Sequence, residues 1–450
     1  MPELRSMEHS GLRRDRLQHG IACWTESYQA AGKHAWAAVY SGWPWSWDFS
    51  HAVMNSIRTL FLAWLVVALC PLLMAGSLSV GAPHFTRISG SISVPAEIAG
   101  HVMFVKVLVN GHGPFRVIVD TGCSVSVVSP ELAEAVGAEI PEPDALADPI
   151  VALNGLGDPT DLQRIMLESI ELGGVRFEGV LAMVSDSFAK LSSIDGRRVD
   201  GALGFPLFAH LFLGLDYPNQ RVLLGPSWPT GVPAAFTSLP VVERADVPFV
   251  QVQIQGKPLE VMIDTGANQA LQLPVKLAPA FQWKVEPRAG SLVAVFGEVG
   301  REEIGRLNGS LLIGGVEQVE PTAVVSAGPA SLGLRSFERF CVVFHQAENK
   351  VWLCGPDSGP IKPTAERSIG LSVCSAPGGL RIAGVIPGSP AAMAHLAAGA
   401  LITQIEHRPA ASWTRDQMEQ WINSHAEVAL VIADKDGARA LTLGVWDLVP

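Results

Sequence analysis

The chain has 450 residues, of which 48% are hydrophobic and 17% are charged, and its formal net charge is −11. This hydrophobic fraction excludes an intrinsically disordered protein, and the acidic balance excludes a basic surface for nucleic acid. The six cysteines are too few for a disulfide scaffold, and neither they nor the 12 histidines show metal-ligand spacing. We therefore expect no metal, no cofactor and no nucleic-acid partner.

The N-terminal extension, residues 1–56, has no steady hydrophobic period and carries a Trp-Pro-Trp-Ser-Trp run at 43–47. We expect it to be unstructured. Met54 precedes Asn-Ser-Ile-Arg, an ordinary start for a signal peptide, so translation could begin at Met1 or at Met54.

One segment, residues 57–80, is apolar enough for a membrane. Residues 60–76 read LFLAWLVVALCPLLMAG, a length that fits either a signal peptide or a short membrane anchor. Lys and Arg lie ahead of it, which predicts a cytoplasmic N-terminus and export of the remainder. We expect a periplasmic protein, or one anchored in the inner membrane through residues 57–80 and facing the periplasm.

The middle of the chain contains an internal repeat. Residues 105–129 and 250–273 each read as a strand, a Gly-containing turn and a second apolar strand that ends in Asp-Thr-Gly. Each copy is followed by an apolar-apolar-Gly element and by a strand–turn–strand segment at 211–226 or 341–356. We expect two β-rich units, residues 91–226 and 241–356, joined by the Pro- and Gly-rich stretch 225–240.

The paired Asp-Thr-Gly motifs predict an acid–base site. Two carboxyls brought together at the tips of buried strands cannot both ionise easily, so one keeps its proton while the other is charged. The charged group can take a proton from a water molecule, and the neutral group can hydrogen-bond a substrate carbonyl. Amide hydrolysis needs this combination.

Val-Ile-Val-Asp-Thr-Gly-Cys-Ser (117–124) and Val-Met-Ile-Asp-Thr-Gly-Ala-Asn (261–268) resemble the active-site signature of aspartic proteases of the pepsin and retropepsin type. Ala202-Leu203-Gly204 and Ser331-Leu332-Gly333 resemble the supporting motif of that family. The resemblance implies that Asp120 and Asp264 form the catalytic dyad. It also implies supporting residues (Thr121, Gly122, Ser124, Thr265, Gly266 and Asn268) and candidate flap tips (Gly155, Gly157 and Gly297).

The resemblance assigns a role to each supporting residue. Thr121 and Thr265 would bond across the interface between the two units, and Gly122 and Gly266 would bring the two loops together. Ser124 would hydrogen-bond Asp120. Asn268 departs from the family, which usually has Ser or Thr there, although an amide can also donate a hydrogen bond.

The expected fold is mainly β, with two pepsin- or retropepsin-like lobes related by a pseudo-dyad and a small α+β domain after them. The chain as a whole resembles a bacterial aspartyl protease with a C-terminal PDZ domain. The implied function is an aspartic endopeptidase that acts on peptide or protein substrates. The alternative is an exported, non-catalytic peptide-binding or scaffold protein on the same fold.

Residues 367–450, which follow a polar linker (357–366), resemble a PDZ domain. Ile369-Gly370-Leu371 is similar to the loop whose backbone N–H groups capture a peptide C-terminus. Ala400 departs from the family, which usually has Asp there. We expect a flexible linker that brings captured C-termini to the protease; the alternative is a domain that only stabilises the second lobe, by contact near Trp352.

Two cysteine questions arise from the sequence. Cys341 and Cys354 face each other if the hairpin turns at Ala347-Glu348, so either a disulfide or apolar packing is possible, and their Leu counterparts in the first repeat favour packing. Cys123 lies beside Asp120 without a nearby His. We expect it to pack and not to act as a nucleophile.

Overall fold

The computed structural model describes residues 84–86, 89–138, 151–153, 159–161, 163–188, 192, 197–233, 235–295, 298–355, 359–434 and 437–450. The N-terminal extension, the segment 57–80 and the three candidate flap glycines lie outside these ranges. The fold is mainly β, as expected. None of the helices within the described ranges is long and apolar enough to cross a membrane.

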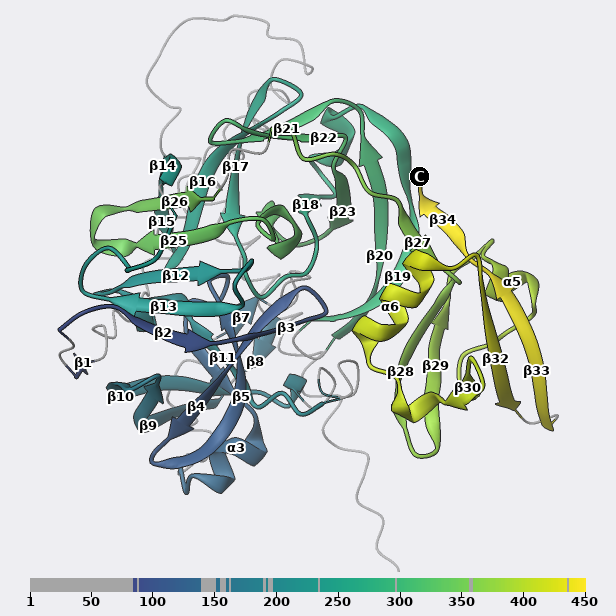
Figure 1. Ribbon diagram of the computed structural model, residues 1–450, viewed down its shortest axis with the longest axis horizontal. Coiled ribbons are helices and arrows are strands. Elements are labelled where there is room, and N and C mark those ends of the chain that lie inside the picture. Colours follow the sequence, from purple (N-terminus) through teal and green to yellow (C-terminus); the bar gives the residue numbers. More distant parts are fainter. Residues whose placement is uncertain are drawn as a thin grey trace, which may run out of the picture. The chain divides into compact units, whose positions relative to one another are not determined.

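The first repeat forms an eight-stranded sheet, here called the first sheet (Figure 1). Its central strand β5 (His112–Asp120) is buried on both faces near its end, which explains why residues 117–119 are continuously apolar. In spatial order the strands are β1 (His84–Phe85), β10 (Val175–Val184), β6 (Ser126–Val128), β11 (Gly201–Gly204), β5, β4 (Val102–Val109) and β3 (Glu97–Ala99), with β9 (Gln163–Leu172) paired to β10 and β4.

The second repeat forms a ten-stranded sheet, the second sheet, around β17 (Lys257–Ile263). In spatial order its strands are β19 (Trp283–Val295), β20 (Glu298–Leu307), β23 (Thr322–Ser326), β18 (Leu271–Pro274), β24 (Ser331–Leu332), β17, β16 (Val247–Ile254), β21 (Ser310–Ile313) and β22 (Val316–Val319), with β15 (Val242–Arg244) paired to β16.

The two sheets share one strand order at their centres. In the first sheet β5 runs parallel to β11, β11 antiparallel to β6, and β6 parallel to β10. In the second sheet β17 runs parallel to β24, β24 antiparallel to β18, and β18 parallel to β23. The sequence repeat is therefore also a repeat of topology.

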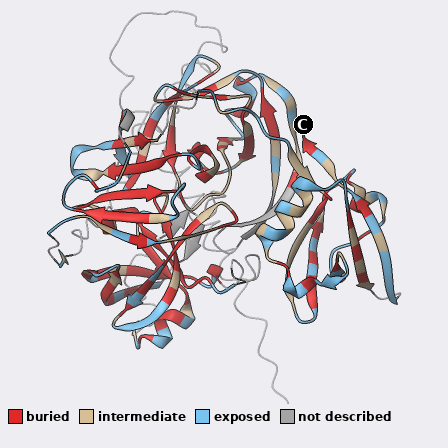
Figure 2. Cartoon of the chain, viewed as in Figure 1, coloured by how far each residue is buried: buried red, intermediate tan, exposed pale blue. Residues whose placement is uncertain are grey.

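A third sheet joins the repeats by pairing their final hairpins. Its six strands are β14 (Ala235–Pro240), β26 (Lys350–Cys354), β25 (Cys341–His345), β12 (Phe212–Asp216), β13 (Arg221–Gly225) and β2 (Ile92–Pro95). β12 of the first repeat pairs with β25 of the second, and most of this sheet is buried (Figure 2). Cys341 pairs with Cys354 in the β25–β26 register, and both are buried free thiols in the structure.

The C-terminal residues form a separate small α+β unit with its own core, which includes Ile382, Ile402, Trp413 and Ile432. Its sheet contains β28 (Leu371–Ala376), β29 (Gly379–Val385), β30 (Leu401–Ile405), β32 (Glu427–Asp434) and β33 (Gly437–Gly444), with β31 (Arg408–Pro409) on β30. Helices α5 (Pro390–Met393) and α6 (Arg415–Ser424) lie between strands, and Thr414 closes the first turn of α6 with a capping box.

Candidate active site

The two aspartates occupy equivalent positions at the ends of strands. Asp120 is the last residue of β5 and pairs with Gly204 of β11. Asp264 follows β17, and its N–H donates to the carbonyl of Leu332 in β24 at 2.9 Å. The two apolar-apolar-Gly motifs therefore lie beside the two Asp-Thr-Gly loops.

The two threonines join the loops by reciprocal hydrogen bonds. The N–H of Thr121 donates to Thr265 Oγ1 at 3.0 Å, and the N–H of Thr265 donates to Thr121 Oγ1 at 3.2 Å. Thr121 Oγ1 in turn donates to the carbonyl of Ile263 at 2.7 Å, and Thr265 Oγ1 donates to that of Val119 at 2.8 Å. Both side chains are buried, so these bonds fix the distance between the two strands that carry the aspartates.

Each glycine of the two motifs lies against the aspartate of the other motif. A Cβ at Gly122 would be 2.6 Å from Asp264 Oδ1, and a Cβ at Gly266 would be closer still to Asp120 Oδ2. Only glycine lets the two loops approach this closely. The same glycines donate N–H groups to the carboxylates of their own motifs, at 2.8 Å for Asp120 and 3.1 Å for Asp264.

The electrostatic environment makes the two carboxyls unequal. Burial raises the pKa of both Asp120 and Asp264. The charge of Asp120 raises the pKa of Asp264 further, whereas donated hydrogen bonds from Cys123 and Gly122 partly offset the rise for Asp120. Backbone hydrogen bonds from Gly266 and Ala267 lower the pKa of Asp264 in turn, but its rise is the larger, so this environment favours a proton on Asp264 over one on Asp120.

The residue that hydrogen-bonds Asp120 is Cys123, where Ser124 was expected. Cys123 Sγ donates to Asp120 Oδ2 at 3.0 Å, while Ser124 is exposed and makes no described hydrogen bond to Asp120. In this turn the third residue after Asp points back to the carboxylate and the fourth points outward. Burial and the charge of Asp120 raise the pKa of the Cys123 thiol well above its usual range, so the thiol keeps its proton and can donate it to the carboxylate.

The second motif lacks such a donor. Ala267 stands where the first motif has Cys123, and Asn268 is half-buried with no hydrogen bond to Asp264 among those described. This difference favours the charge on Asp120. The signal in the sequence is position: Cys123 and Ala267 are each the third residue after the aspartate of their motif, and only Cys123 can donate a side-chain hydrogen bond.

The proposed peptide-binding loop has its polar groups partly occupied. Ile369 and Leu371 are buried in the C-terminal core, and Gly370, with φ 89°, donates its N–H to Ser368 Oγ at 2.9 Å. The loop leads into β28, which is the edge strand of its sheet. Within the described part of the chain, no group of three or more His, Cys, Asp or Glu side chains could hold a metal ion.

Comparison with known families supports a peptidase. Residues 105–207 match a family model described as aspartyl protease. The matched stretch contains Asp120 and the Ala202-Leu203-Gly204 motif, and it ends before the second Asp-Thr-Gly. No curated protein shows significant similarity to this chain.

Proposed function

We propose that this protein is a bilobal aspartic endopeptidase whose catalytic dyad is Asp120 and Asp264. The observation that carries the proposal is the reciprocal packing of the two Asp-Thr-Gly loops, in which each glycine accommodates the opposite carboxyl. The first and second sheets are then the two lobes, and one chain supplies the whole site. The family match at residues 105–207 supports the reaction class.

The proposed mechanism uses the unequal protonation of the dyad. Asp120, as the charged carboxylate, takes a proton from a water molecule as the water oxygen attacks the scissile carbonyl carbon. Asp264, as the neutral acid, gives its proton to the carbonyl oxygen, which produces a neutral tetrahedral diol. Collapse of the diol transfers a proton from Asp120 to the leaving nitrogen and returns a proton to Asp264, which restores the starting state.

The same electrostatics imply that activity is lost as the pH rises. The reaction requires one proton on the pair, and burial raises the pKa of both carboxyls. The singly protonated state therefore extends above the ordinary range of Asp and is lost once Asp264 ionises.

Digestion of a mixed peptide library from pH 3 to 7 tests the proposal directly. Asp120→Asn and Asp264→Asn should each abolish cleavage, and both variants should keep the circular dichroism spectrum of the wild type. Asp186→Asn, which changes an exposed carboxylate outside the site, is the matched control and should cleave normally. Substantial cleavage by either dyad variant would refute the dyad, and peptide binding without cleavage by the wild type would favour a non-catalytic scaffold.

We also propose export of residues after about 80, with the segment 57–80 as signal or anchor, because basic residues precede that apolar run. Alkaline phosphatase fusions placed after residue 90 should be active and fusions placed before residue 50 inactive; the reverse pattern would refute export.

The C-terminal unit is proposed to be PDZ-like, with β28 as the strand to which a peptide C-terminus would add. The expected flexible tether is contradicted by the described part of the linker, residues 359–366, which is hydrogen-bonded to the second sheet. Ile361 N–H donates to the carbonyl of Glu317 at 2.7 Å, and Arg306 Nη2 donates to that of Thr364 at 2.5 Å. The ring of Trp352 contacts Phe212, Trp228 and Lys350, and the last strand of the C-terminal unit packs instead on Val285 and Ile304.

A further inference from the structure

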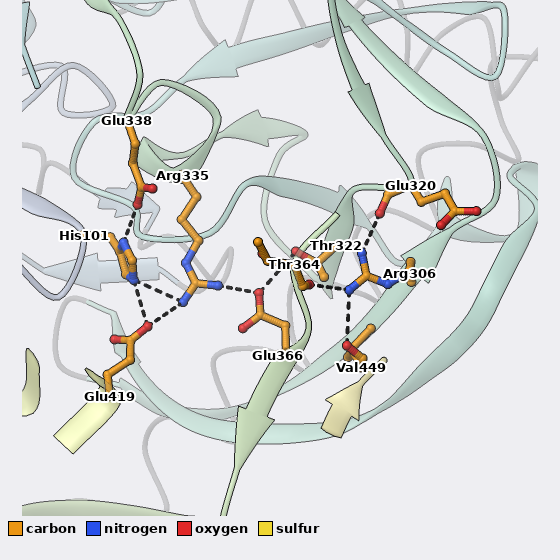
Figure 3. A network of polar contacts seen from close by, with 10 residues as sticks. All are labelled: His101, Arg306, Glu320, Thr322, Arg335, Glu338, Thr364, Glu366, Glu419 and Val449. Atoms are coloured by element: carbon orange, nitrogen blue, oxygen red, sulfur yellow. Dashed lines mark hydrogen bonds and ion pairs between the residues drawn. The ribbon is translucent and has the colours of Figure 1, made fainter. Parts of the chain in front are cut away.

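A cluster of charged side chains joins three separate parts of the chain (Figure 3). The five residues that form the cluster, called here the junction cluster, are His101, Arg335, Glu338, Glu366 and Glu419. His101 belongs to the first repeat, Arg335 and Glu338 to the second, and Glu366 and Glu419 to β27 (Glu366–Ser368) and α6. The proposed mechanism uses none of them.

On the first-repeat side, the cluster lies next to the strand that leads to Asp120. His101 is in the turn between β3 and β4, one residue before β4 begins. β4 pairs with β5, and this ladder ends at Phe104 and Ile118. His101 lies three residues from the paired end of β4, and Asp120 lies two residues beyond the paired end of β5.

On the second-repeat side, the cluster lies next to the loop that carries Asp264. Arg335 is the middle residue of the short 3₁₀ helix η3 (Leu334–Ser336), and both of its neighbours bond that loop. The N–H of Leu334 donates to the carbonyl of Ala267 at 2.9 Å, and Ser336 Oγ donates to that of Ala270 at 2.8 Å. A displacement of Arg335 would thus be transmitted to the loop.

Helix α6 of the C-terminal unit connects these two sides. Glu419 Oε1 lies 3.0 Å from His101 Nε2 and 3.2 Å from Arg335 Nη2, so one carboxylate contacts both repeats. Asp416, in the first turn of α6, accepts the N–H of Gly100 at 2.8 Å. Glu338 contacts the other ring nitrogen of His101, and Glu366 contacts Arg335.

The rest of the C-terminal unit is fixed to the second sheet. β34 (Trp446–Val449) pairs with β27, and Leu448 and Val449 are buried with Val285 and Ile304 of β19 and β20. Arg306 of β20, itself buried, donates to the carbonyls of Pro450 at 2.6 Å and Val449 at 3.2 Å. The C-terminal unit is therefore packed on the second sheet, and its helix α6 contacts the first repeat through Glu419 and Asp416.

The protonation state of His101 follows from its neighbours. Its two ring nitrogens face two carboxylates, Glu338 and Glu419, while the guanidinium of Arg335 opposes a positive charge on the ring. Burial lowers the pKa of His101, but the hydrogen bonds to Glu338 and Glu419 outweigh it and raise the pKa to about 9. Nε2 of His101 could accept a hydrogen bond from Arg335 Nη2 only if the ring were neutral. The two carboxylates favour the protonated ring instead, in which both ring nitrogens are donors.

Other charged groups also face this region. Glu302 is half-buried near Arg335, Arg415 and Glu366, and burial raises its pKa to about 7 despite the two arginines. The hydrogen bond with His101 lowers the pKa of Glu419 to about 2. Protonated His101 and charged Glu419 thus coexist across the whole acid range in which the dyad is proposed to work.

We infer that the C-terminal unit is an intramolecular clamp: through Glu419 it holds His101 and Arg335, and with them the two aspartate-bearing loops, at the spacing that catalysis requires. His101, Arg335 and Glu419 are positioning residues, because each acts through the loop next to it. This inference rests on the proposed function, since the loops it positions are those of the proposed dyad. In this view the attachment of the C-terminal unit to both repeats controls the rate of catalysis, which a flexible linker would not do.

The first test compares full-length Glu419→Gln and His101→Gln with the wild type on one short peptide that lacks a free C-terminal carboxylate. Each variant should lower kcat about three- to tenfold with little change in KM, and the double variant should lose no more than the worse single variant. The upper limb of the pH profile of kcat/KM should move to lower pH, because separated carboxyls no longer raise the pKa of Asp264. Glu427→Gln, an exposed carboxylate of the same unit, is the matched control.

A second measurement keeps this inference separate from the proposed function. Hydrogen exchange at the N–H groups of Thr121 and Thr265, which bond across the two loops, should be faster in Glu419→Gln than in Glu427→Gln, whether or not the protein cleaves peptides. Unchanged exchange, or unchanged kcat and pH profile in an active enzyme, would overturn the clamp. An inactive wild type with faster exchange in Glu419→Gln would refute the proposed function and leave the clamp standing.

Discussion

The thiol of Cys123 lies 3.0 Å from Oδ2 of Asp120, and the matching place in the second repeat is occupied by the methyl group of Ala267. The two loops, whose threonines and glycines are reciprocal, are therefore unequal in the side-chain donor that each aspartate accepts from. The thiol of Cys123 donates a hydrogen bond to the carboxylate to which the mechanism assigns the charge. A thiol is a weaker donor than a hydroxyl, so the bias toward charge on Asp120 is modest.

Replacing Cys123 should move the acid limb of activity. Cys123→Ala removes the donor, so the pKa of Asp120 rises and the lower limb of the pH profile of kcat/KM shifts to higher pH. Cys123→Ser introduces a stronger donor, so the pKa of Asp120 should fall and the lower limb of the pH profile should shift to lower pH. A change of about tenfold in kcat/KM is expected, since a net hydrogen bond to a charged group contributes about 1.5–3 kcal/mol and a thiol, as a weak donor, falls at the lower end of that range. Ser124→Ala should have no effect; a shift with that variant and none with Cys123→Ala would contradict the assignment.

The raised pKa of the dyad predicts that the protein loses stability as pH rises. Unfolded Asp titrates near 3.8, whereas the folded pair titrates higher because of burial. Between these values the folded chain binds more protons than the unfolded chain, so the free energy of unfolding falls with increasing pH. Urea denaturation from pH 3 to 7 should give a free energy of unfolding whose slope with pH is more negative in the wild type than in Asp264→Asn, a comparison in which carboxylates with lowered pKa values, such as Glu419, cancel. Equal slopes for the two proteins would argue against a shared proton.

A side chain at Gly122 should disable the site without a large effect on the rest of the fold. In Gly122→Ala the new Cβ would be 2.6 Å from Asp264 Oδ1, so the two loops must separate. A displacement of this kind costs about a hundredfold in rate. Gly444→Ala, in β33 with open space at the Cβ position, is the matched control. Wild-type kcat in Gly122→Ala would show that the loops do not approach as described.

His101 predicts a second stability change, at alkaline pH. Its pKa is raised from 6.5 to about 9 by the hydrogen bonds that outweigh burial, so its contribution is fully present below pH 6.5 and is lost as the pH rises through about 9. The free energy of unfolding of the inactive Asp120→Asn chain, measured from pH 6 to 10, should fall in this window. Adding His101→Gln should remove that fall, and an unchanged fall would assign it to another group.

The sequence predicted the mainly β class and the identity of the two loops, because strand alternation and a repeated Asp-Thr-Gly are local signals. It missed the hydrogen bond of Cys123, since the direction of a side chain in a tight turn does not follow from strand periodicity. It also missed the junction cluster, whose members His101, Arg335 and Glu419 are far apart in the chain and carry no motif. The candidate flap glycines lie outside the described residues, so they stay predictions.

In the proposed function, one carboxyl from each repeat contributes to a single site in each chain. Titration calorimetry with a peptide that carries a tetrahedral hydroxyl in place of the scissile carbonyl measures this directly, because such a group mimics the intermediate. We predict one bound peptide per wild-type chain, and binding weakened at least about a hundredfold in both Asp120→Asn and Asp264→Asn. One bound peptide per two chains, or unchanged affinity in either variant, would contradict a single site built from both repeats.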